Sequence, residues 1–401
     1  MTEKAPDAPV VDTSVASDAK SFLVDAVEVR RRIHAEPELG LDLPRTQRVV
    51  LDALAGLGLE VHTGEATTSV VAVLDGARPG PTTLLRADMD ALPMSEETGL
   101  PFASRTEGRM HACGHDAHVA MLLGAARLLS GRRTELGGRV VFMFQPGEES
   151  YGGAKVMLDE GLLDRHGPVD RGFAIHITPE LPSGWVATRG GPVMASADEF
   201  RITVTGAGGH ASMPHNATDP VPVACEIVTA LQTMVTRRVP AFDPAVLTVA
   251  RVTAGTTTNV IPERAVLEGT IRAVSDSTRD MVVEGAAHVA EHLATAHRCR
   301  AELELLAGNY PVTVNDAASA EFALATAAAL FSADHTVTLP TPVMGAEDWS
   351  YVLQRVPGSM TFLGAAPPGV EHPEPNHSNR FVIDEEAMAA GIALHAAMAL
   401  S

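Results

Sequence analysis

The chain has 401 residues, 45% of them hydrophobic, so it is long enough to form large buried cores and more than one domain. Lys and Arg total 30 against 50 Asp and Glu, a formal net charge of −20. This acidic balance argues against nucleic acid or an anionic membrane as the main partner and favours a soluble protein.

The start of the chain shows no targeting signal. The first 20 residues lack the cationic start and apolar core of a signal peptide, and no apolar run approaches the roughly 18 residues of a membrane span. Only three cysteines occur, an odd number that indicates a reducing compartment without a disulfide framework. We therefore expect residues 1–20 to be a disordered tail and the protein to be cytoplasmic.

The first elements along the chain are helical. Apolar residues between about 21 and 58 recur with helical spacing around a central polar loop. The segments 69–76 and 82–91 have the aliphatic runs of buried strands, and the second ends in the acidic pair Asp88 and Asp90. Catalytic side chains are often found at such strand ends.

Strands and helices then alternate. One strand ends in a turn that carries Glu148 and Glu149, and a later strand carries His176 near its end. This alternation predicts an α/β fold with a mainly parallel sheet covered by helices on both faces. The expected elements are a helix at 117–131, a strand at 139–149 that includes the turn, a helix at 154–164 and a strand at 171–180.

The pattern changes after Gly190. Residues 196–308 have the order βαββαβ, which predicts an inserted α+β ferredoxin-like unit with its own core. The alternating pattern returns beyond residue 309. We therefore expect a catalytic domain formed by 21–195 plus 309–401, interrupted by an inserted lid or dimerisation domain.

The segment HACGHDAH, residues 111–118, is the strongest candidate for a metal site. His111, His115 and His118 fall at i, i+4 and i+7 and could share one helical face, so spacing alone does not choose among them. Each histidine alone is more often structural than a ligand. Thiolate, imidazole and carboxylate groups are the ligands of zinc-type ions. The candidate ligands along the chain are Cys113, His115, Glu149, His176 and His377.

Six motifs in a fixed order carry a family resemblance: RADMDALP, MHACGHDAH, QPGEE, GGHASMPH, NVIPE and NHSNRF. With them, the chain resembles the co-catalytic metallohydrolases that include aminoacylases, hippurate hydrolases and indole-acetyl-amino-acid hydrolases. The resemblance covers nearly all of residues 21–401. The cysteine in HACGHDAH is typical of this amidohydrolase branch, which is related to carboxypeptidase G and to several dipeptidases.

The resemblance implies two divalent metal ions, zinc or manganese, with cobalt or nickel as alternatives. Cys113 would lie at the bridging position. Glu149 and His377 would bind one metal, and His115 and His176 would bind the other. Relatives usually have a proline within two residues after the position of His377, whereas Ser378, Asn379 and Arg380 follow it here.

The resemblance also assigns roles beside the ligands. Glu148 is implied as the general base, which takes a proton from the attacking water and passes it to the leaving amine. Asp88 matches an aspartate that steadies a histidine ligand two residues earlier, but here that position is Arg86, so Asp88 either orients a ligand or caps the strand end. His111 and His118 are left with supporting roles. An acidic pair, Glu347 and Asp348, resembles one near the family's site and is not assigned as a ligand.

The inserted domain is expected to reach the substrate. His210 resembles the histidine that stabilises the oxyanion, with a surface histidine in a glycine-rich loop as the alternative. Asn259 and Arg272 match positions that bind the substrate carboxylate, although Arg272 could instead form an internal ion pair. The two domains would then close about hinges near 190–196 and 306–311.

These observations predict a metal-dependent amidohydrolase. Its substrates would be N-acyl-L-amino acids of the hippurate or N-acetyl-amino-acid kind, cleaved to a carboxylic acid and a free amino acid. The alternatives are a dipeptidase or carboxypeptidase of the same superfamily, or a relative that binds metal or ligand without catalysis. The exposed strand edge expected in the inserted domain would also allow a homodimer.

Overall fold

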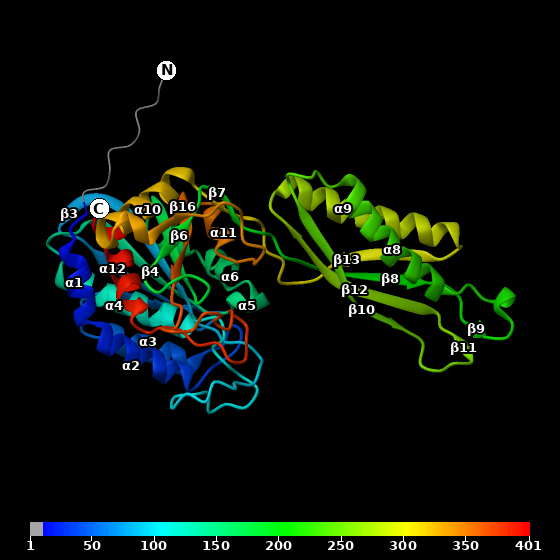
Figure 1. The fold of residues 1–401 in the computed structure, drawn as a ribbon, viewed down its shortest axis with the longest axis horizontal. Coiled ribbons are helices and arrows are strands. Elements are labelled where there is room, and N and C mark those ends of the chain that lie inside the picture. The colour runs from blue at the N-terminus through cyan, green and yellow to red at the C-terminus, as the bar shows by residue number, and fades with distance from the viewer. Residues whose placement is uncertain (1–10) are drawn as a thin grey trace, which may run out of the picture. The chain divides into compact units, whose positions relative to one another are not determined.

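The computed structural model describes residues 11–401, which divide into two compact units (Figure 1). The first unit contains the chain up to Val193, together with Val314–Thr341 and Asp348–Ser401. The second contains Met194–Thr313 and Pro342–Glu347. The second unit thus covers the expected insertion 196–308 and also takes in 309–313 and Pro342–Glu347, which the sequence analysis assigned to the catalytic domain.

A large mixed sheet organises the first unit, with strand order β1-β2-β4-β3-β5-β16-β6-β15. The pairs β4–β3, β3–β5, β5–β16 and β6–β15 are parallel, so the predicted mainly parallel α/β fold is confirmed. The strands are β1 Glu60–Thr63, β2 Val70–Asp75, β3 Arg78–Asp88, β4 Gly137–Gln145, β5 Arg171–Thr178, β6 Val186–Thr188, β15 Thr336–Thr338 and β16 Gly358–Gly364.

Helices bury this sheet on both faces. Residues 140–145 of β4 are all buried, although successive side chains point to opposite faces, and such a strand needs cover on both sides. The helix α4, His115–Gly131, is buried along most of its length and packs on β3 and against α2 and α12. The helices are α1 Ser14–Ser21, α2 Leu23–His34, α3 Pro44–Leu54, α5 Glu148–Tyr151, α6 Gly153–Asp159, α7 Leu162–Arg165, α10 Ala317–Phe331, η2 Ala333–His335, α11 Ser350–Leu353 and α12 Ala387–Leu400.

Two local predictions are wrong. The expected disordered tail is wrong for residues 14–20, because α1 forms there and its Val15 and Ala19, one turn apart, are fully buried in the core. Residues 1–10 of that predicted tail lie outside the described residues. The helix expected at 154–164 is split into α6 and α7, since Gly161 adopts a left-handed conformation with φ +90°.

The second unit has its own core, and the elements of its main sheet and its two long helices follow the order βαββαβ. Its main sheet has the strand order β10-β12-β8-β13, with every pair antiparallel. Asp219 caps α8 by accepting the Val221 N–H at 2.9 Å, and Pro220 follows at the first helical position. The elements are β8 Asp198–Thr205, β9 Gly209–His210, η1 Pro214–Asn216, α8 Pro220–Arg238, β10 Ala245–Ala254, β11 Val260–Ile261, β12 Arg264–Ala273, α9 Asp276–Ala296 and β13 Arg300–Leu305.

Two short strands occur at the boundaries between the units. β7, Gly191–Met194, and β14, Thr313–Asn315, form a two-stranded sheet. Across the described residues, every helix is too short or too polar to cross a membrane.

Candidate metal centre

The candidate site lies where the parallel strands β3, β4 and β5 end. β3 and β4 finish in register, with Asp88 opposite Gln145, and the turn after β4 carries Glu148 and Glu149. His176 stands near the end of β5. Polar side chains from separate segments therefore meet at the carboxyl edge of the sheet, where α/β proteins build their sites.

The five predicted metal ligands form two overlapping groups. The donor atoms of Cys113, His115 and His176 lie within 4.8 Å of one another, and those of Cys113, Glu149 and His377 meet the same limit. Each residue offers one ligand atom, and Cys113 belongs to both groups. The structure thus brings together all five residues that the sequence singled out.

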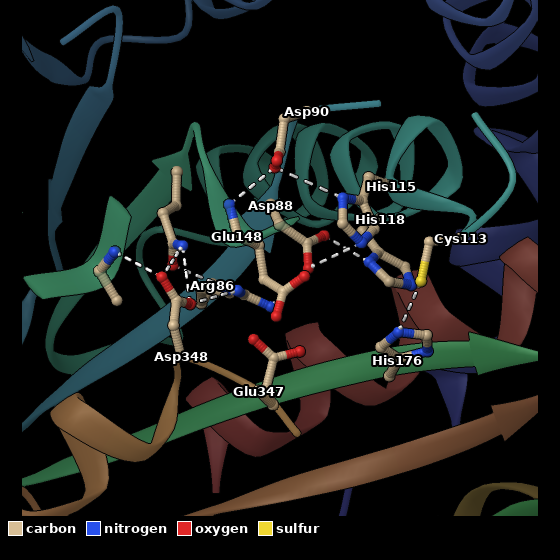
Figure 2. A network of polar contacts seen from close by, with 12 residues as sticks. Arg86, Asp88, Asp90, Cys113, His115, His118, Glu148, His176, Glu347 and Asp348 are labelled. Carbon is tan, nitrogen blue, oxygen red and sulfur yellow. Dashed lines mark hydrogen bonds and ion pairs between the residues drawn. The ribbon is translucent and has the colours of Figure 1, made fainter. Parts of the chain in front are cut away.

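The hydrogen bonds of His176 prepare one ring nitrogen for a metal. Its Nδ1 lies 2.8 Å from the carbonyl oxygen of Ile177 and therefore carries the ring proton. The Nε2 lone pair is then directed at Cys113 Sγ, 3.4 Å away (Figure 2). Burial, together with the neighbouring His118, lowers the pKa of His176 well below its usual value. A neutral imidazole in this state is what a metal ion requires.

His115 is completely buried, and neither of its ring nitrogens has a hydrogen-bond partner among the described residues. Carboxylates flank the ring, with Asp88 Oδ2 at 3.5 Å from Nε2 and Asp90 Oδ1 at 3.6 Å from Nδ1. Burial is the largest single influence and opposes protonation, but Asp88, Cys113 and Asp90 together outweigh it and raise the pKa of His115. A buried nitrogen without a partner is costly. Together with sulfur and carboxylate donors, it fits a zinc-type ion at this position.

The loop that carries His377 is held tightly against the cysteine. His377 has φ +68°, a conformation that non-glycine residues rarely adopt, and its N–H donates to the Ala112 carbonyl oxygen at 2.8 Å. Asn376 Nδ2 donates to the Cys113 carbonyl oxygen at 3.0 Å. His377 Nε2 lies 3.2 Å from Glu149 Oε1. Cys113 and Glu149 raise the pKa of His377 to about 10.

Asp88 joins Arg86 to His118 rather than supporting an earlier histidine. It accepts Arg86 Nη1 at 2.6 Å through Oδ2 and His118 Nδ1 at 2.5 Å through Oδ1. His118 Nε2 in turn accepts the Ile177 N–H at 2.8 Å. Both ring nitrogens of His118 are therefore engaged. The ambiguity that the histidine spacing left open is resolved by these contacts, which leave His118 without a free donor for a metal.

Asp348 anchors the strands below the site. Its carboxylate accepts a hydrogen bond from Arg86 Nη2 at 3.1 Å (Figure 2). It also accepts Gln145 Nε2 and the Ala154 N–H, each at 2.8 Å. These contacts bind β3, β4 and α6 together. Glu347, the other acidic residue of the predicted pair, is buried and belongs to the second unit.

A second buried cluster joins the HACGHDAH segment to helix α2 through Asp116, His34 and Arg30. Asp116 contacts His34 Nδ1 at 2.8 Å and Arg30 Nε at 3.0 Å. Burial alone would lower the pKa of His34, but Asp116 and Glu96 raise it to about 9. The ring nitrogens of His111 are buried without a hydrogen bond in the described chain, and burial lowers the pKa of His111 to about 3. His111 therefore packs as a neutral side chain.

The predicted substrate-binding residues His210, Asn259 and Arg272 all belong to the second unit. His210 on β9 pairs with Val260 on β11, and the Asn259 carbonyl oxygen accepts the Ala211 N–H at 3.2 Å. Arg272 on β12 makes no ion pair within the described residues, although the charges of Asp198 and Glu199 partly offset burial, which lowers the pKa of its guanidinium. Their roles toward the metal centre remain predictions.

The ring orientation of His210 is set locally. Its Nδ1 accepts the Ser212 N–H at 3.2 Å and lies 2.8 Å from Ser212 Oγ. A nitrogen that accepts a backbone N–H cannot carry a proton, so the neutral ring holds its proton on Nε2. This tautomer can donate a hydrogen bond, as an oxyanion donor must.

Sequence reasoning named Asp90 as part of an acidic pair but gave it no role, and it missed Asp116 and Asn376. Asp90 had a detectable signal, because it stands two residues after Asp88 at the end of a predicted buried strand. Asp116 and Asn376 lie directly beside predicted ligands. Their backbone and side-chain partners come from distant segments, which sequence spacing does not show.

Residues 84–401 match the model of Peptidase family M20/M25/M40. Thermostable carboxypeptidase 1 of Saccharolobus solfataricus is 38% identical over 93% of this chain and 94% of its own length. N-acetylcysteine deacetylase of Bacillus subtilis is 37% identical over 95% of this chain and 97% of its own length. The crystal structure of the Bacillus subtilis YXEP protein, described as a dinuclear metal binding peptidase from the M20 family, aligns with a TM-score of 0.81 and 35% identity. That alignment covers 95% of this chain and 98% of the YXEP chain.

Proposed function

The chain belongs to Peptidase family M20/M25/M40 and is a hydrolase of amide bonds, and from this premise we propose that it is a metal-dependent amidohydrolase of N-acyl-L-amino acids. The products are a carboxylic acid and a free amino acid. The observation that carries the proposal is the membership of Cys113 in two donor groups, since one shared ligand between two sets is the arrangement that holds a pair of metals.

Cys113 would bridge two divalent ions, with Glu149 and His377 toward one and His115 and His176 toward the other. We propose zinc or manganese, with cobalt or nickel as alternatives. The ligand types and the metals available in the cell together decide which ion is bound. When bound, such a pair polarises an amide carbonyl and makes water acidic enough to act near neutral pH.

Glu148 is proposed as the general base. It is 6% exposed and directly precedes the proposed ligand Glu149, so it lies beside the metal centre. Its carboxylate would take a proton from the attacking water and deliver it to the nitrogen of the leaving amine, a transfer that typically contributes 10²–10⁴-fold in rate.

Residues of the second unit would bind and polarise the substrate. His210, with its proton on Nε2, would donate to the developing oxyanion. Arg272 would pair with the carboxylate of the amino-acid half, since a guanidinium can donate two parallel hydrogen bonds to a planar carboxylate. Asn259 would add a further contact to the same carboxylate. Asp88 would steady the ligands from behind through His118 and His115.

The similarity to a carboxypeptidase of S. solfataricus favours a second candidate function. A carboxypeptidase of this fold would also bind a free carboxylate, but its acyl side would be an extended peptide. A relative that binds an acyl amino acid without cleaving it is the third reading. The chain retains a candidate base and five candidate ligands, which favours catalysis.

We also propose a cytoplasmic homodimer that acts on small molecules, with neither nucleic acid nor membrane as partner. β10 forms one edge of the sheet in the second unit, and its Val246 and Val252 are 48% and 54% exposed. An edge strand with free backbone groups can pair with the same strand of a second copy. Sedimentation equilibrium of the wild-type chain would test this, and a monomer at micromolar concentration would contradict it.

The decisive experiment is a hydrolysis panel with defined metals. The protein is depleted by a chelator, reloaded with zinc, manganese, cobalt or nickel, and assayed for release of free amine. The panel varies the acyl group and the amino acid independently and includes dipeptides and N-acylated peptides. We expect N-acyl amino acids to be cleaved fastest. Faster removal of C-terminal residues from longer peptides would favour the carboxypeptidase, and no turnover of any N-acyl amino acid with any of these metals would refute the proposed function.

A further inference from the structure

One buried carboxylate holds the turn that carries the proposed base Glu148 and the proposed ligand Glu149. Asp90 lies just beyond the end of β3 and is 1% exposed. Its Oδ1 accepts the Glu148 N–H at 2.9 Å (Figure 2). Its Oδ2 accepts the Glu149 N–H at 2.9 Å. Each oxygen thus holds one of two consecutive backbone amides. Such bonds to an ionised acceptor are stronger than those between neutral groups.

The turn itself is irregular. Gly147 has φ +73°, Glu149 has φ −70° and ψ +80°, and Ser150 has φ +69°. A non-glycine residue with positive φ is uncommon, and such a backbone persists only when its surroundings hold it. The backbone leaves the regular helical conformation at Glu149 and Ser150. The directions of the Glu148 and Glu149 side chains therefore do not follow helical spacing. The backbone bonds to Asp90 act at the point where this departure begins.

The same carboxylate also faces a proposed metal ligand. Asp90 Oδ1, which accepts the Glu148 amide, lies 3.6 Å from His115 Nδ1. His115 opens α4, whereas the two glutamates follow β4. Asp90 therefore contacts the backbone of the base, the backbone of ligand Glu149 and the ring of ligand His115.

We propose that Asp90 is a positioning residue that sets the distance between the general base Glu148 and the metal ligands Glu149 and His115. This proposal rests on the proposed function. Asp90 does not bind metal or substrate itself. It acts by fixing the backbone of the Glu148–Glu149 turn, so that one carboxylate is directed toward the metals and the other stays available for proton transfer.

The test uses Asp90→Asn in the full chain. The asparagine amide has the same size but only one accepting oxygen. Its NH₂ group would face one of the two backbone N–H groups, and that hydrogen bond would be lost. Hydrogen–deuterium exchange, read by mass spectrometry on the segment 145–151, should become at least about tenfold faster. Zinc titration of the metal-depleted protein should show roughly 10–100-fold weaker binding, the range found when a partner behind a ligand is removed. With the zinc-loaded protein, kcat should fall and KM change little.

The matched control is Glu38→Gln. Glu38 is 4% exposed and likewise accepts two consecutive backbone amides, Arg45 N–H at 3.3 Å and Thr46 N–H at 2.9 Å. It has the same kind of contact without touching a proposed ligand. It should therefore lower the thermal midpoint comparably, but leave exchange at 145–151, zinc affinity and kcat near the wild-type values.

The proposal is overturned if Asp90→Asn keeps wild-type exchange at 145–151 and wild-type zinc affinity, or if Glu38→Gln changes both to the same extent. Should Asp90→Asn fail to fold, Asp90→Glu retains the charge and shifts the oxygens by one methylene. That variant should keep the fold and still weaken zinc binding; unchanged binding in it would contradict the proposal. Exchange and zinc titration need no substrate, so an inactive wild type would refute the proposed function without deciding the role of Asp90.

Discussion

Cys113 Sγ lies 3.4 Å from His176 Nε2, and the other ring nitrogen of this histidine is bonded to the Ile177 carbonyl oxygen at 2.8 Å. The backbone therefore decides which nitrogen faces the thiol. Because the same sulfur also lies within 4.8 Å of the donor atoms of Glu149 and His377, it is the common member of both ligand groups. A change at this sulfur should affect both metal positions.

Replacing Cys113 with serine should remove the soft ligand while keeping nearly the same volume. We expect zinc binding to weaken by more than about 100-fold, beyond the range for residues that only support a ligand. Isothermal titration of the metal-depleted protein would measure this. Cys225→Ser, the same change at an exposed position of α8, serves as control and should bind zinc as the wild type does. Equal zinc affinity in both variants would contradict the bridging role.

The two adjacent glutamates should respond in opposite ways to the same substitution. Glu148→Gln should retain both metals and lose about 10²–10⁴-fold in kcat, because the base cannot accept a proton. Glu149→Gln should lose metal first, since its carboxylate is the proposed ligand beside His377. Metal content by elemental analysis, measured next to kcat, separates the two effects. A Glu148→Gln variant with wild-type turnover would refute the base assignment.

The sequence predicts the parallel sheet well because buried strands leave local marks, whereas the choice of ligand residues rests on the family resemblance and stays a prediction. Buried strands appear as aliphatic runs, and Cys113 and His115 stand in a dense motif. By contrast, the contacts of Asp90 and Asn376 depend on backbone groups of segments that are distant in sequence. The helix at Ser14–Ser21 was missed for a similar reason, since only tertiary packing of Val15 and Ala19 distinguishes it from a polar tail.

Arg86 shows how one departure from a family pattern changes a whole network. It is 1% exposed and donates to Asp88, Gln145 and Asp348. The guanidinium is always charged, so it compensates the buried carboxylates of Asp88 and Asp348. A neutral histidine at this position would not. The sequence revealed the substitution, but its partner Asp348 is far along the chain, and only the structure identifies it.

Arg272→Lys should raise KM for N-acyl amino acids and leave kcat nearly unchanged. Loss of a bidentate contact to a carboxylate typically costs 1.5–3 kcal/mol, or roughly 10–150-fold in KM. If Arg272 binds the substrate carboxylate, the wild type should lose a similar factor with the corresponding N-acyl amino acid amide. The variant should then barely distinguish acid from amide.

The control for this prediction is Arg201→Lys, the same change on neighbouring β8. Arg201 lies opposite Glu268 and pairs with its carboxylate at 2.8 Å, so it has an internal partner that Arg272 lacks. Its substitution should leave the preference for acid over amide as in the wild type. A variant of Arg272 that retained this preference would exclude a role in carboxylate recognition.

The buried His34 should make stability depend on pH in a defined direction. Burial would lower its pKa, but Asp116 and Glu96 raise it from 6.5 to about 9 in the folded protein. A raised pKa means that the folded state holds the proton more tightly than the unfolded chain does. The stabilisation is therefore fully present below pH 6.5 and is lost as pH rises through about 9; its size is at most about 3 kcal/mol.

In metal-depleted protein, the difference in unfolding midpoint between wild type and His34→Gln should be largest near pH 6 and shrink toward pH 9. His166 offers the opposite case, because burial lowers its pKa, so the effect of His166→Gln should shrink as pH falls below 6.5. A His34→Gln difference that grows with pH would show that Asp116 does not hold this histidine in its charged form.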